Sequence, residues 1–483
     1  MKNNSQWNSI YTFIMAMIGL TIGIGNIWRF SYVLYSNGGG SFFIPYFIAI
    51  FVMGIPFLIL EYGLGFSLKK SFSKLMHDIR PEFEVIAWML VLFVFIVVIY
   101  YMVILAWDLI YFISSFTSAW GSDTTSFFVN NVGGSSNLTS SVSIIIPTFI
   151  SVILLWAVFW FISNHEVNSG IGRVSKVLMP LLFILIIIIF LYSFSLPGFS
   201  SGITTLFTPN WNALYDIRVW LAAFAQIIFT LSIGQAMVYT YASYLSDNTK
   251  LIDHVLIVVA SNSFYEIFVA LGVFSILGYM SLVSSVPINE LITSGPSLIF
   301  VVFPQIFNVM GPVGFVLAPL LFLSILFAGF TSLFALFEPL LSSIISKFNL
   351  SRKKGVTILA CVACIFSLLF ATSIGSYLLE LVDSFLNEFA ILILIGVQSI
   401  IFGWFYGLDK VIPVLNEYST FKVGKKWKFA IKYVLPIIII VIWIYGIINL
   451  FSDATLFELI VDLIITFVVL GLSVFFTKVN IHQ

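Results

Sequence analysis

The chain has 483 residues, of which 60% are hydrophobic and only 9% are charged. Soluble domains carry about 25% charged residues, so this composition indicates an integral membrane protein. The 21 basic and 21 acidic side chains give a formal net charge of zero, which argues against a nucleic-acid partner. The two cysteines, Cys361 and Cys364, share one apolar stretch and are too few for a disulfide framework.

Apolar runs separated by polar breaks predict twelve membrane-spanning helices. We expect these spans at residues 9–35, 41–67, 85–115, 142–163, 172–196, 214–245, 252–281, 313–346, 355–375, 377–408, 429–450 and 455–476. The predicted fold class is therefore an all-α integral membrane protein whose outer surface contacts the lipid bilayer.

The basic residues between the spans indicate the orientation in the bilayer. They gather on one side of the predicted topology, at Lys2, Lys69, Lys70, Lys74, Arg80, Arg173, Lys176, Lys250, Lys347, Arg352, Lys353, Lys354, Lys410, Lys422, Lys425, Lys426, Lys428, Lys432 and Lys478. Only Arg29 and Arg218 fall toward the other side. The positive-inside rule makes the lysine-rich side, with both termini, cytoplasmic. Short termini and outer loops without cysteine favour a prokaryotic plasma (inner) membrane.

A glycine-rich stretch interrupts the first span at residues 19–30, which read Gly-Leu-Thr-Ile-Gly-Ile-Gly-Asn-Ile-Trp-Arg-Phe. Glycine weakens helix propagation, and Asn26 and Arg29 are costly in hydrocarbon. Backbone that leaves the helix inside a membrane must be buried in protein or line a wet cavity. We therefore predict an unwound segment whose free carbonyls and amides hold an ion and a polar substrate.

A second interruption lies in the sixth span, at residues 229–235. Its Leu-Ser-Ile-Gly at 231–234 reads like the Leu-Thr-Ile-Gly at 20–23. The two motifs are five spans apart, and an odd number of crossings inverts the second unit relative to the first. Interrupted spans at corresponding positions of two halves point to a transporter binding site near the membrane midplane. Either segment alone would favour close helix packing, but both together favour a site.

These residues resemble the signature motifs of the neurotransmitter:sodium symporter family. The matching segments are 23–30, 37–40, 43–46, 54–57, Glu61, 196–198, 208–211, 226–234, 241–244, 327–332 and 407–410. The likeness covers spans one to ten and is weaker in the last two. One departure is Ser31, where the family usually has proline.

The resemblance implies a leucine-transporter-type fold in a single transporter domain over residues 1–475. Its parts would be a first five-helix repeat at 9–196, an inverted second repeat at 214–408 and two additional helices at 429–476. It also implies sodium-driven uptake by alternating access, with no enzymatic activity. The expected partners are a small amino acid and the bilayer, and the expected state is a monomer or weak homodimer.

The resemblance further implies two sodium sites and no other cofactor. The first would use the Thr21 carbonyl, the side chains of Asn26, Thr230 and Asn262, and the substrate carboxylate. The second would use carbonyls of Gly19, Ile22 and Ala328 and hydroxyls of Thr331 and Ser332. Both sets offer the neutral oxygens that suit a hard monovalent cation, without the carboxylates that a divalent ion prefers. Taken alone, Thr331 and Ser332 would be interpreted as residues that form hydrogen bonds between helices.

The half-helix that starts after Gly25 offers free amides and a positive dipole end to a carboxylate. By resemblance, Tyr101 hydrogen-bonds the same carboxylate. Relatives that carry monoamines have an aspartate where this chain has Gly23. Because no carboxylate awaits the substrate, we expect the substrate to bring its own, which favours an α-amino acid over a decarboxylated amine.

The side-chain pocket that the resemblance implies is mostly apolar and suits a neutral, hydrophobic or aromatic substrate. With the backbone ligands, the substrate-binding residues are Leu20, Thr21, Gly23, Gly25, Val97, Tyr101, Phe229, Thr230, Ser232, Gln235, Ser332 and Leu336. Gln235 stands where relatives often have an apolar or aromatic residue. It either tunes specificity by donating to a polar substrate side chain or hydrogen-bonds the unwound backbone.

Two gates are implied on the same basis. Arg29 and Asp383 match the outer gate pair, with Tyr101 and Phe229 as an aromatic lid beneath them. At the inner gate, Asn4 and Ser346 replace the family's arginine and aspartate, while Trp7 and Tyr244 remain. We therefore expect cytoplasmic closure to rest on hydrogen bonds and the Trp7 plug.

Glu266 falls where chloride-dependent relatives have a small polar residue, and Tyr46, Gln226 and Thr230 match the rest of that chloride site. A carboxylate there supplies the negative charge itself, so we predict chloride-independent transport. On the return step without sodium, Glu266 would take up a proton, which makes proton antiport a second expectation. The alternative is that Glu266 only caps a buried polar cluster. Glu61 is expected to satisfy backbone groups freed near an unwound helix.

Two other functions compete with sodium-coupled transport. A transport-inactive amino-acid sensor would use the same fold, and the ion ligands argue against it without excluding it. A channel would need a selectivity filter, and neither a repeated carbonyl motif nor an acidic ring is visible.

Overall fold

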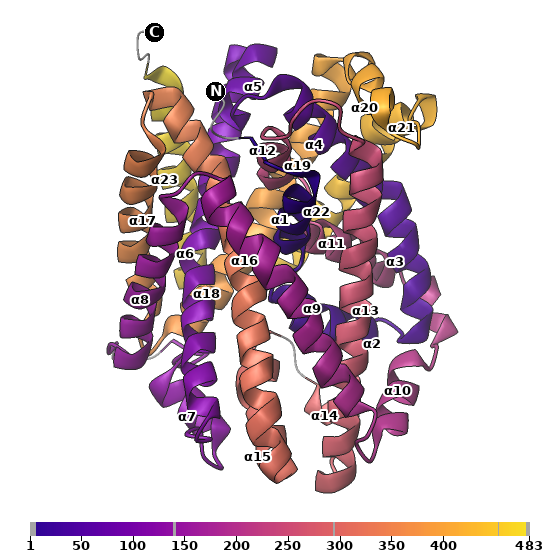
Figure 1. Cartoon of the computed structure of the whole chain (residues 1–483), viewed down its shortest axis with the longest axis vertical. Coiled ribbons are helices and arrows are strands. Elements are labelled where there is room, and N and C mark those ends of the chain that lie inside the picture. Colours follow the sequence, from indigo (N-terminus) through magenta and orange to yellow (C-terminus); the bar gives the residue numbers. More distant parts are fainter. Residues whose placement is uncertain (1–5, 139–141, 293–294, 453, 480–483) are drawn as a thin grey trace.

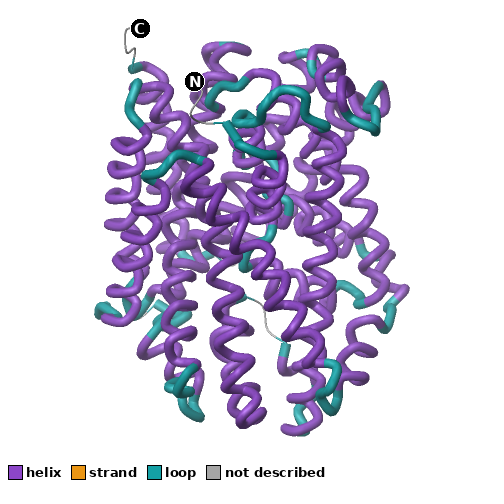
Figure 2. Tube along the Cα trace, in the orientation of Figure 1, coloured by secondary structure: helices purple, strands orange, loops and turns teal. Residues whose placement is uncertain are grey.

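A computed structural model describes the chain except for residues 1–5, 139–141, 293–294, 453 and 480–483. The described residues form helices joined by short connections, and their only β pairings are two isolated bridges (Figure 1; Figure 2). This confirms the predicted all-α class. Asn4, which was expected at the inner gate, lies outside the described residues.

Ten continuous helical segments of the described chain are long and apolar enough to cross a membrane. They are Gly40–Leu68, Pro81–Ser115, Ile146–Ser163, Ser169–Ser193, Leu251–Ser284, Leu298–Phe348, Arg352–Phe370, Gly375–Tyr406, Lys425–Ser452 and Leu456–Lys478. Each overlaps a predicted span, although Leu298–Phe348 begins 15 residues before the predicted eighth span and includes a separate short helix, α15 (Phe303–Met310), before α16 (Gly314–Phe348). The two remaining predictions, the first and sixth spans, are the two that the sequence marks as interrupted.

The first span is broken into α1 (Ile10–Thr21) and α2 (Gly25–Ser36), which meet at an angle of 53°. Ser9 caps the start of α1 by accepting a hydrogen bond from the Thr12 amide. At the break, the Asn26 side chain accepts a hydrogen bond from the Gly23 amide at 2.9 Å. This polar residue within an apolar span thus provides a hydrogen-bond acceptor for a backbone N–H group that has left the helix.

The sixth span consists of two short helices, α11 (Ile217–Thr230) and α12 (Met237–Ala242). In the segment between them, Ser232, Gly234 and Ala236 all have positive φ, which interrupts the helical ladder. α11 is too short to cross the bilayer alone. The span is therefore discontinuous, as the sequence predicts.

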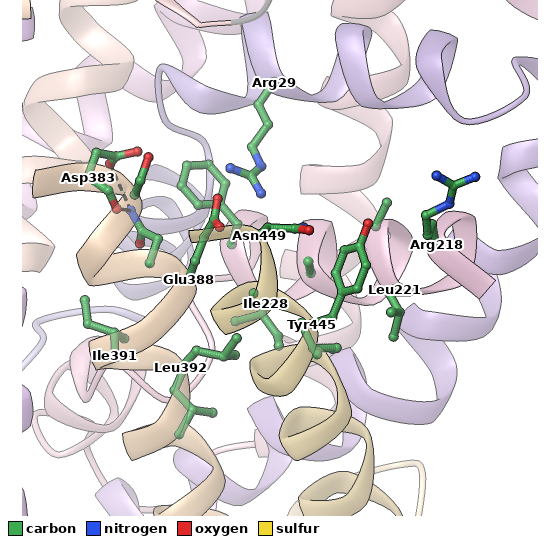
Figure 3. Close-up of a pocket in the computed structure, with 18 of the residues that line it drawn as sticks. Arg29, Arg218, Leu221, Ile228, Asp383, Glu388, Ile391, Leu392, Tyr445 and Asn449 are labelled. Carbon is green, nitrogen blue, oxygen red and sulfur yellow. Dashed lines mark hydrogen bonds between the residues drawn. The ribbon is translucent and has the colours of Figure 1, made fainter. Parts of the chain in front are cut away.

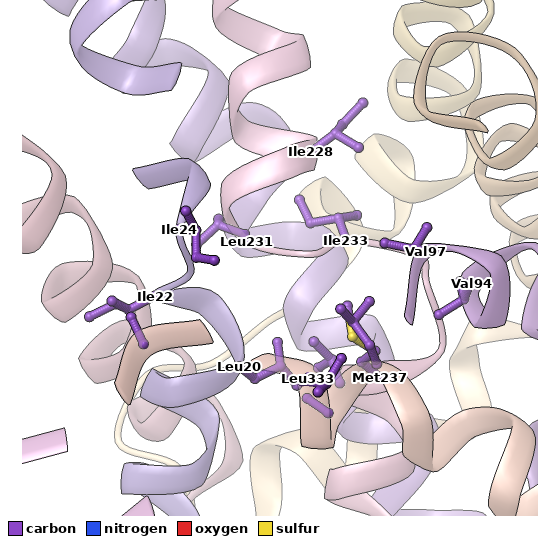
Figure 4. Packing of buried hydrophobic residues seen from close by; sticks show 14 of the residues in the cluster. Leu20, Ile22, Ile24, Val94, Val97, Ile228, Leu231, Ile233, Met237 and Leu333 are labelled. Atoms are coloured by element: carbon purple, nitrogen blue, oxygen red, sulfur yellow. The ribbon is translucent and has the colours of Figure 1, made fainter. Parts of the chain in front are cut away.

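Apolar side chains fill the interior around both breaks. Leu20, Ile24, Leu231, Ile233 and Val97 come together there (Figure 4). The long helices α6 (Glu84–Ser115) and α16 (Gly314–Phe348) pack against each other through the middle of the protein. By contrast, α22 (Leu435–Ser452) and α23 (Leu456–Lys478) expose most of their apolar surface, as lipid-facing helices do.

The two ends of the molecule differ. The described chain begins and ends at one end, the terminal face, with α5 (Phe72–Ile79), α20 (Ile412–Tyr418) and α21 (Lys425–Phe429) (Figure 1). The other end, the opposite face, carries α7 (Thr124–Asn131), α14 (Ile288–Leu291) and α15 (Phe303–Met310). The remaining helices are α3 (Phe43–Ala49), α4 (Ile55–Leu68), α8 (Ile146–Ser163), α9 (Arg173–Ser193), α10 (Phe199–Phe207), α13 (Leu251–Ser284), α17 (Arg352–Ser367), α18 (Gly375–Ser384) and α19 (Ile391–Ile400).

Candidate substrate and ion site

The first cluster of polar groups links the break in α1–α2 to α11 and α13. The Asn26 amide donates to Thr230 Oγ1 and to Asn262 Oδ1, both at 2.9 Å. Asn262 in turn donates to Thr230 Oγ1 at 2.9 Å. All three side chains are at most 2% exposed. The structure thus brings together the three side chains that the sequence assigns to a first sodium, close to the end of α1 at Thr21.

A second cluster of oxygens lies between α1 and α16. The Ser332 hydroxyl is 3.0 Å from the Gly19 carbonyl oxygen and 3.2 Å from that of Ile22. One residue earlier, the Thr331 hydroxyl is 2.9 Å from the Ala328 carbonyl oxygen. The five residues assigned to a second sodium therefore meet at one helix contact, and the oxygens present are neutral, as that cation prefers.

Gly23 faces the open side of the break. A Cβ atom there would lie 3.1 Å from Ser332 Oγ and 3.2 Å from Tyr101 Oη. The Tyr101 hydroxyl also accepts a hydrogen bond from the Ile24 amide at 3.3 Å. The Tyr101 and Ser332 hydroxyls thus converge at Gly23, beside the Gly23 and Ile24 amides, whose N–H groups have side-chain acceptors in this conformation.

Phe229 covers this position on the α11 side. A Cβ atom on Gly25 would come within 2.3 Å of the Phe229 ring, so only glycine permits this approach. The guanidinium of Arg29 lies 4.7 Å from the centre of the same ring, which is cation–π distance. The other pocket residues, Leu20, Val97, Ser232 and Leu336, are buried nearby.

The Gln235 side chain makes no hydrogen bond to the unwound backbone beside it. Gly234 in that backbone has other partners: its amide donates to Glu61 at 3.2 Å, and its carbonyl accepts from Gln398 at 2.7 Å. Glu61 therefore has the backbone role expected from the sequence, and Gln398 shares it. Gln235 instead lines a cavity of about 270 Å³, which leaves its amide available to a ligand.

This cavity lies between the breaks and the opposite face, because its walls include the first turn of α11 and the last turn of α22. Charged groups of both signs line it (Figure 3): Arg29, Arg218, Asp383 and Glu388. Arg29 points toward the two carboxylates. A pocket of mixed charge is suited to a zwitterion passing through.

The expected outer gate pair, Arg29 and Asp383, does not form an ion pair in this conformation. Asp383 instead accepts hydrogen bonds from Tyr100 at 2.6 Å and from Asn387 at 2.8 Å. Glu388, to which the sequence assigned no role, is a second carboxylate in the wall of the cavity that Arg29 lines. A π-helical segment, η10 (Phe385–Ala390), carries Glu388 beside the cavity, and such segments are frequent at functional sites.

On the terminal side of the breaks the structure is closed. The Trp7 indole donates to the Tyr241 carbonyl at 2.9 Å, and the Trp7 amide donates to the Tyr244 carbonyl at 2.9 Å. Trp7 is 4% exposed, so it is buried at the position where we expect the plug of the inner gate.

In addition to the expected hydrogen bonds and the Trp7 plug, this closure contains an ion pair that the sequence did not predict. Arg352, at the start of α17, pairs with the buried Glu338 of α16. Tyr244 donates to the same carboxylate at 3.2 Å. Ser346 is exposed and takes no part. The sequence does carry a signal for Glu338, because an acid within an apolar span marks a functional position, but its partner lies 14 residues away beyond a turn.

Glu266 lies in a fully buried polar cluster. Its carboxylate accepts from Tyr46 at 2.6 Å and from Gln226 at 2.9 Å. Tyr46 also donates to Ser263 at 3.2 Å. The cluster shares α11 with Thr230 of the first oxygen cluster, so the acid sits close to the place assigned to sodium.

Two discontinuous helices around buried oxygen clusters, open toward one face and closed toward the other, define a secondary transporter. The family model of the sodium:neurotransmitter symporter family matches residues 4–137 and 121–461. An uncharacterized sodium-dependent transporter of Methanocaldococcus jannaschii is 35% identical over 434 residues, which cover 90% of this chain and 88% of that protein.

Two further proteins extend the comparison. The sodium- and chloride-dependent GABA transporter 2 of Rattus norvegicus is 28% identical, covering 92% of this chain and 80% of its own. The crystal structure of MhsT in complex with L-phenylalanine superposes with a TM-score of 0.77 at 26% identity, covering 92% of this chain and 99% of that one. The chain belongs to the sodium:neurotransmitter symporter family. It is a sodium-dependent membrane transporter and not an enzyme.

Proposed function

We propose that the protein imports a neutral, hydrophobic or aromatic L-amino acid together with sodium by alternating access. The absence of a side chain at Gly23 is the observation from which we infer the substrate class. Because Gly23 has no side chain, the Tyr101 and Ser332 hydroxyls lie against its backbone with no acidic side chain between them, so the site would not repel a substrate carboxylate. That MhsT was crystallised with L-phenylalanine supports an apolar or aromatic side chain.

Sodium coupling follows from the position of the two oxygen clusters. In the first, the substrate carboxylate would complete the ligand set of Asn26, Thr230 and Asn262, so substrate and ion would each raise the affinity for the other. In the second, an ion between α1 and α16 would fix Thr331 and Ser332 against Gly19 and so hold the two helices together. We assign one sodium to each cluster.

Chloride independence rests on Glu266. Its carboxylate accepts hydrogen bonds from Tyr46 and Gln226, and in this position it would replace an external anion beside the first sodium. After sodium leaves, a proton would replace the lost positive charge, and outward return of the protonated carrier would export that proton.

The gates would work in opposition. The terminal face, which carries most of the basic residues, is the cytoplasmic face in this proposal. The Trp7 plug and the Glu338–Arg352 pair would keep it closed while substrate enters from the opposite face. Arg29 would then close over the substrate against Asp383 and Glu388, and Phe229 would lie between the substrate and the cavity.

A competition assay with the twenty amino acids tests the substrate class. Purified protein in proteoliposomes, with an inward sodium gradient, is given a labelled aromatic amino acid and each competitor in turn. We expect neutral apolar and aromatic L-amino acids to compete, and acidic amino acids and decarboxylated amines to fail. Competition by an amine that lacks a carboxylate would contradict the assignment.

The same panel with Gln235→Phe tests the role of Gln235. Because the amide faces the cavity, we expect the variant to lose preference for any substrate with a polar side-chain group and to keep purely apolar ones. An unchanged competition profile would show that Gln235 does not tune specificity.

A further inference from the structure

The terminal ends of the tenth and eleventh spans form a surface that nothing in the transport mechanism uses. It consists of η11 (Ile401–Tyr406), α21 and η13 (Ala430–Val434), which we call the η11–η13 surface. Two π-helical segments meet there. The Trp404 indole donates to the Lys432 carbonyl at 3.0 Å, and Ser399 donates to the Ile431 carbonyl at 3.2 Å, so the two spans are tied at this end.

Aromatic side chains project from this surface. Trp404, Phe429 and Tyr433 are 54%, 59% and 40% exposed. Exposed tryptophan and tyrosine at the ends of membrane-spanning helices lie at the level of the lipid headgroups. The surface therefore sits at the boundary between acyl chains and water, where a lipid phosphate would be.

The same surface has a surplus of positive charge. Residues 401–435 contain six lysines and two acids, namely Lys410, Lys422, Lys425, Lys426, Lys428 and Lys432 with Asp409 and Glu417. Asp409 already forms an ion pair with Lys428, with 2.5 Å between its Oδ2 and the lysine Nζ. Lys425 and Lys426 are exposed and form no ion pair within the described part of the chain.

Two cations are held against aromatic faces. The Lys432 ammonium lies 4.3 Å from the Trp404 ring centre, and the Arg80 guanidinium lies 4.6 Å from the Phe405 ring centre. These contacts leave the N–H groups of both cations free to donate. Trp427 anchors the surface from below, because it is 7% exposed and donates to the Pro56 carbonyl of α4 at 3.0 Å. The lysines of α21 are thus presented from a fixed backbone.

We propose that the η11–η13 surface is a binding site for the headgroup of an anionic phospholipid. Lys425, Lys426 and Lys432 contact the phosphate, and Trp404 and Tyr433 lie along the glycerol and upper acyl region. Charge complementarity identifies the occupant, since basic clusters at the end of a membrane span attract acidic lipids. The aromatic side chains require that the anion be attached to a lipid, which distinguishes it from free phosphate.

Lipid titration of the purified full-length protein tests the site. Wild-type protein in phosphatidylcholine nanodiscs is titrated with phosphatidylglycerol and analysed by native mass spectrometry. We expect specific phosphatidylglycerol adducts, and the combination Lys425→Gln, Lys426→Gln and Lys432→Gln to weaken them by about fivefold for each lysine removed. Replacing the same residues by arginine should preserve binding and shows that the altered surface still folds.

A matched triple variant controls for total charge. Lys353, Lys354 and Lys478 are exposed residues of the terminal face outside the η11–η13 surface, and their replacement by glutamine should leave the adducts unchanged. Equal binding by wild type and the first glutamine variant would overturn the proposal, as would an equal loss in the control variant. Displacement of the lipid by millimolar inorganic phosphate would point to a free-anion site instead.

Discussion

Gly23 is the residue on which the substrate class depends. Replacing it by aspartate places a negative charge beside Tyr101 and Ser332, where we expect the substrate carboxylate. We predict that Gly23→Asp loses amino-acid uptake by at least about 100-fold, because like charges a few ångströms apart in a buried site repel by several kcal/mol. Labelled uptake in proteoliposomes measures the loss.

Gly23→Asn separates charge from size, because asparagine has nearly the same shape as aspartate without its charge. A Cβ atom there already lies 3.1 Å from Ser332 Oγ, so we expect partial loss from crowding alone. If the asparagine and aspartate variants lose uptake equally, the carboxylate is not bound at Gly23.

Glu266 is the residue that decides the anion requirement. We expect Glu266→Ser to need external chloride for uptake, because the serine leaves Tyr46 and Gln226 as donors around a space without negative charge. Uptake in chloride and in gluconate buffers, at equal sodium, measures this. Wild-type protein should be indifferent to the exchange, and a Glu266→Ser variant that is equally indifferent would refute the role.

At the residue scale, the family resemblance was needed to group the polar residues of different spans. Asn26, Asn262 and Glu266 are polar residues inside apolar spans, and the structure places each within hydrogen-bond distance of a neighbour that the resemblance implies. The sequence could not predict that Asp383 accepts hydrogen bonds from Tyr100 and Asn387 and does not pair with Arg29. Which partner Asp383 has depends on the conformation and not on the residue types.

At the scale of elements, the closure of the terminal face depends on the contact between α16 and α17. Removing one partner of a buried ion pair leaves an uncompensated charge, at a cost of about 3–5 kcal/mol. We therefore expect Glu338→Gln to shift the protein toward opening at the terminal face. The double variant Glu338→Gln with Arg352→Gln should recover part of the closed population, since no buried charge remains.

Thiol labelling measures this opening. Ser342, a buried residue of α16 one turn from Glu338, is replaced by cysteine in a chain whose Cys361 and Cys364 are changed to alanine. We expect slow labelling with Glu338 intact and faster labelling in Glu338→Gln. Identical labelling rates would mean that the Trp7 plug alone holds the face closed.

The broken helices were predictable because glycines and polar residues cluster inside otherwise apolar spans. The ion pair of the inner closure was not predictable, because Asn4 and Ser346 are uncharged at the two positions where the family has its charged pair. The ion pair instead joins Glu338, about three turns before the end of α16, to Arg352 at the start of the next helix, α17. A contact between two elements of different spans depends on how they pack, which local patterns do not specify.

For the whole molecule, the hydropathy pattern predicts ten spans that the described chain forms as long apolar helices, and the first and sixth predicted spans are each divided into shorter helices. Which helices form the interior is less evident from composition. The span Pro81–Ser115, which contains α6, and α23 are about equally apolar, yet 78% of the most apolar stretch of the first is buried and only 17% of that of the second. Packing partners, and not hydropathy, make that difference, and they place the two oxygen clusters at the centre of the molecule.

The most direct test of sodium-coupled transport is concentrative uptake. Proteoliposomes with an inward sodium gradient are given the best substrate from the competition panel, and its internal concentration is followed over time. We expect accumulation above the external concentration, unchanged when gluconate replaces chloride, and its collapse when a sodium ionophore is added. Saturable binding without accumulation, or uptake that only equilibrates with the outside, would contradict sodium-coupled symport and indicate a sensor or a passive pathway.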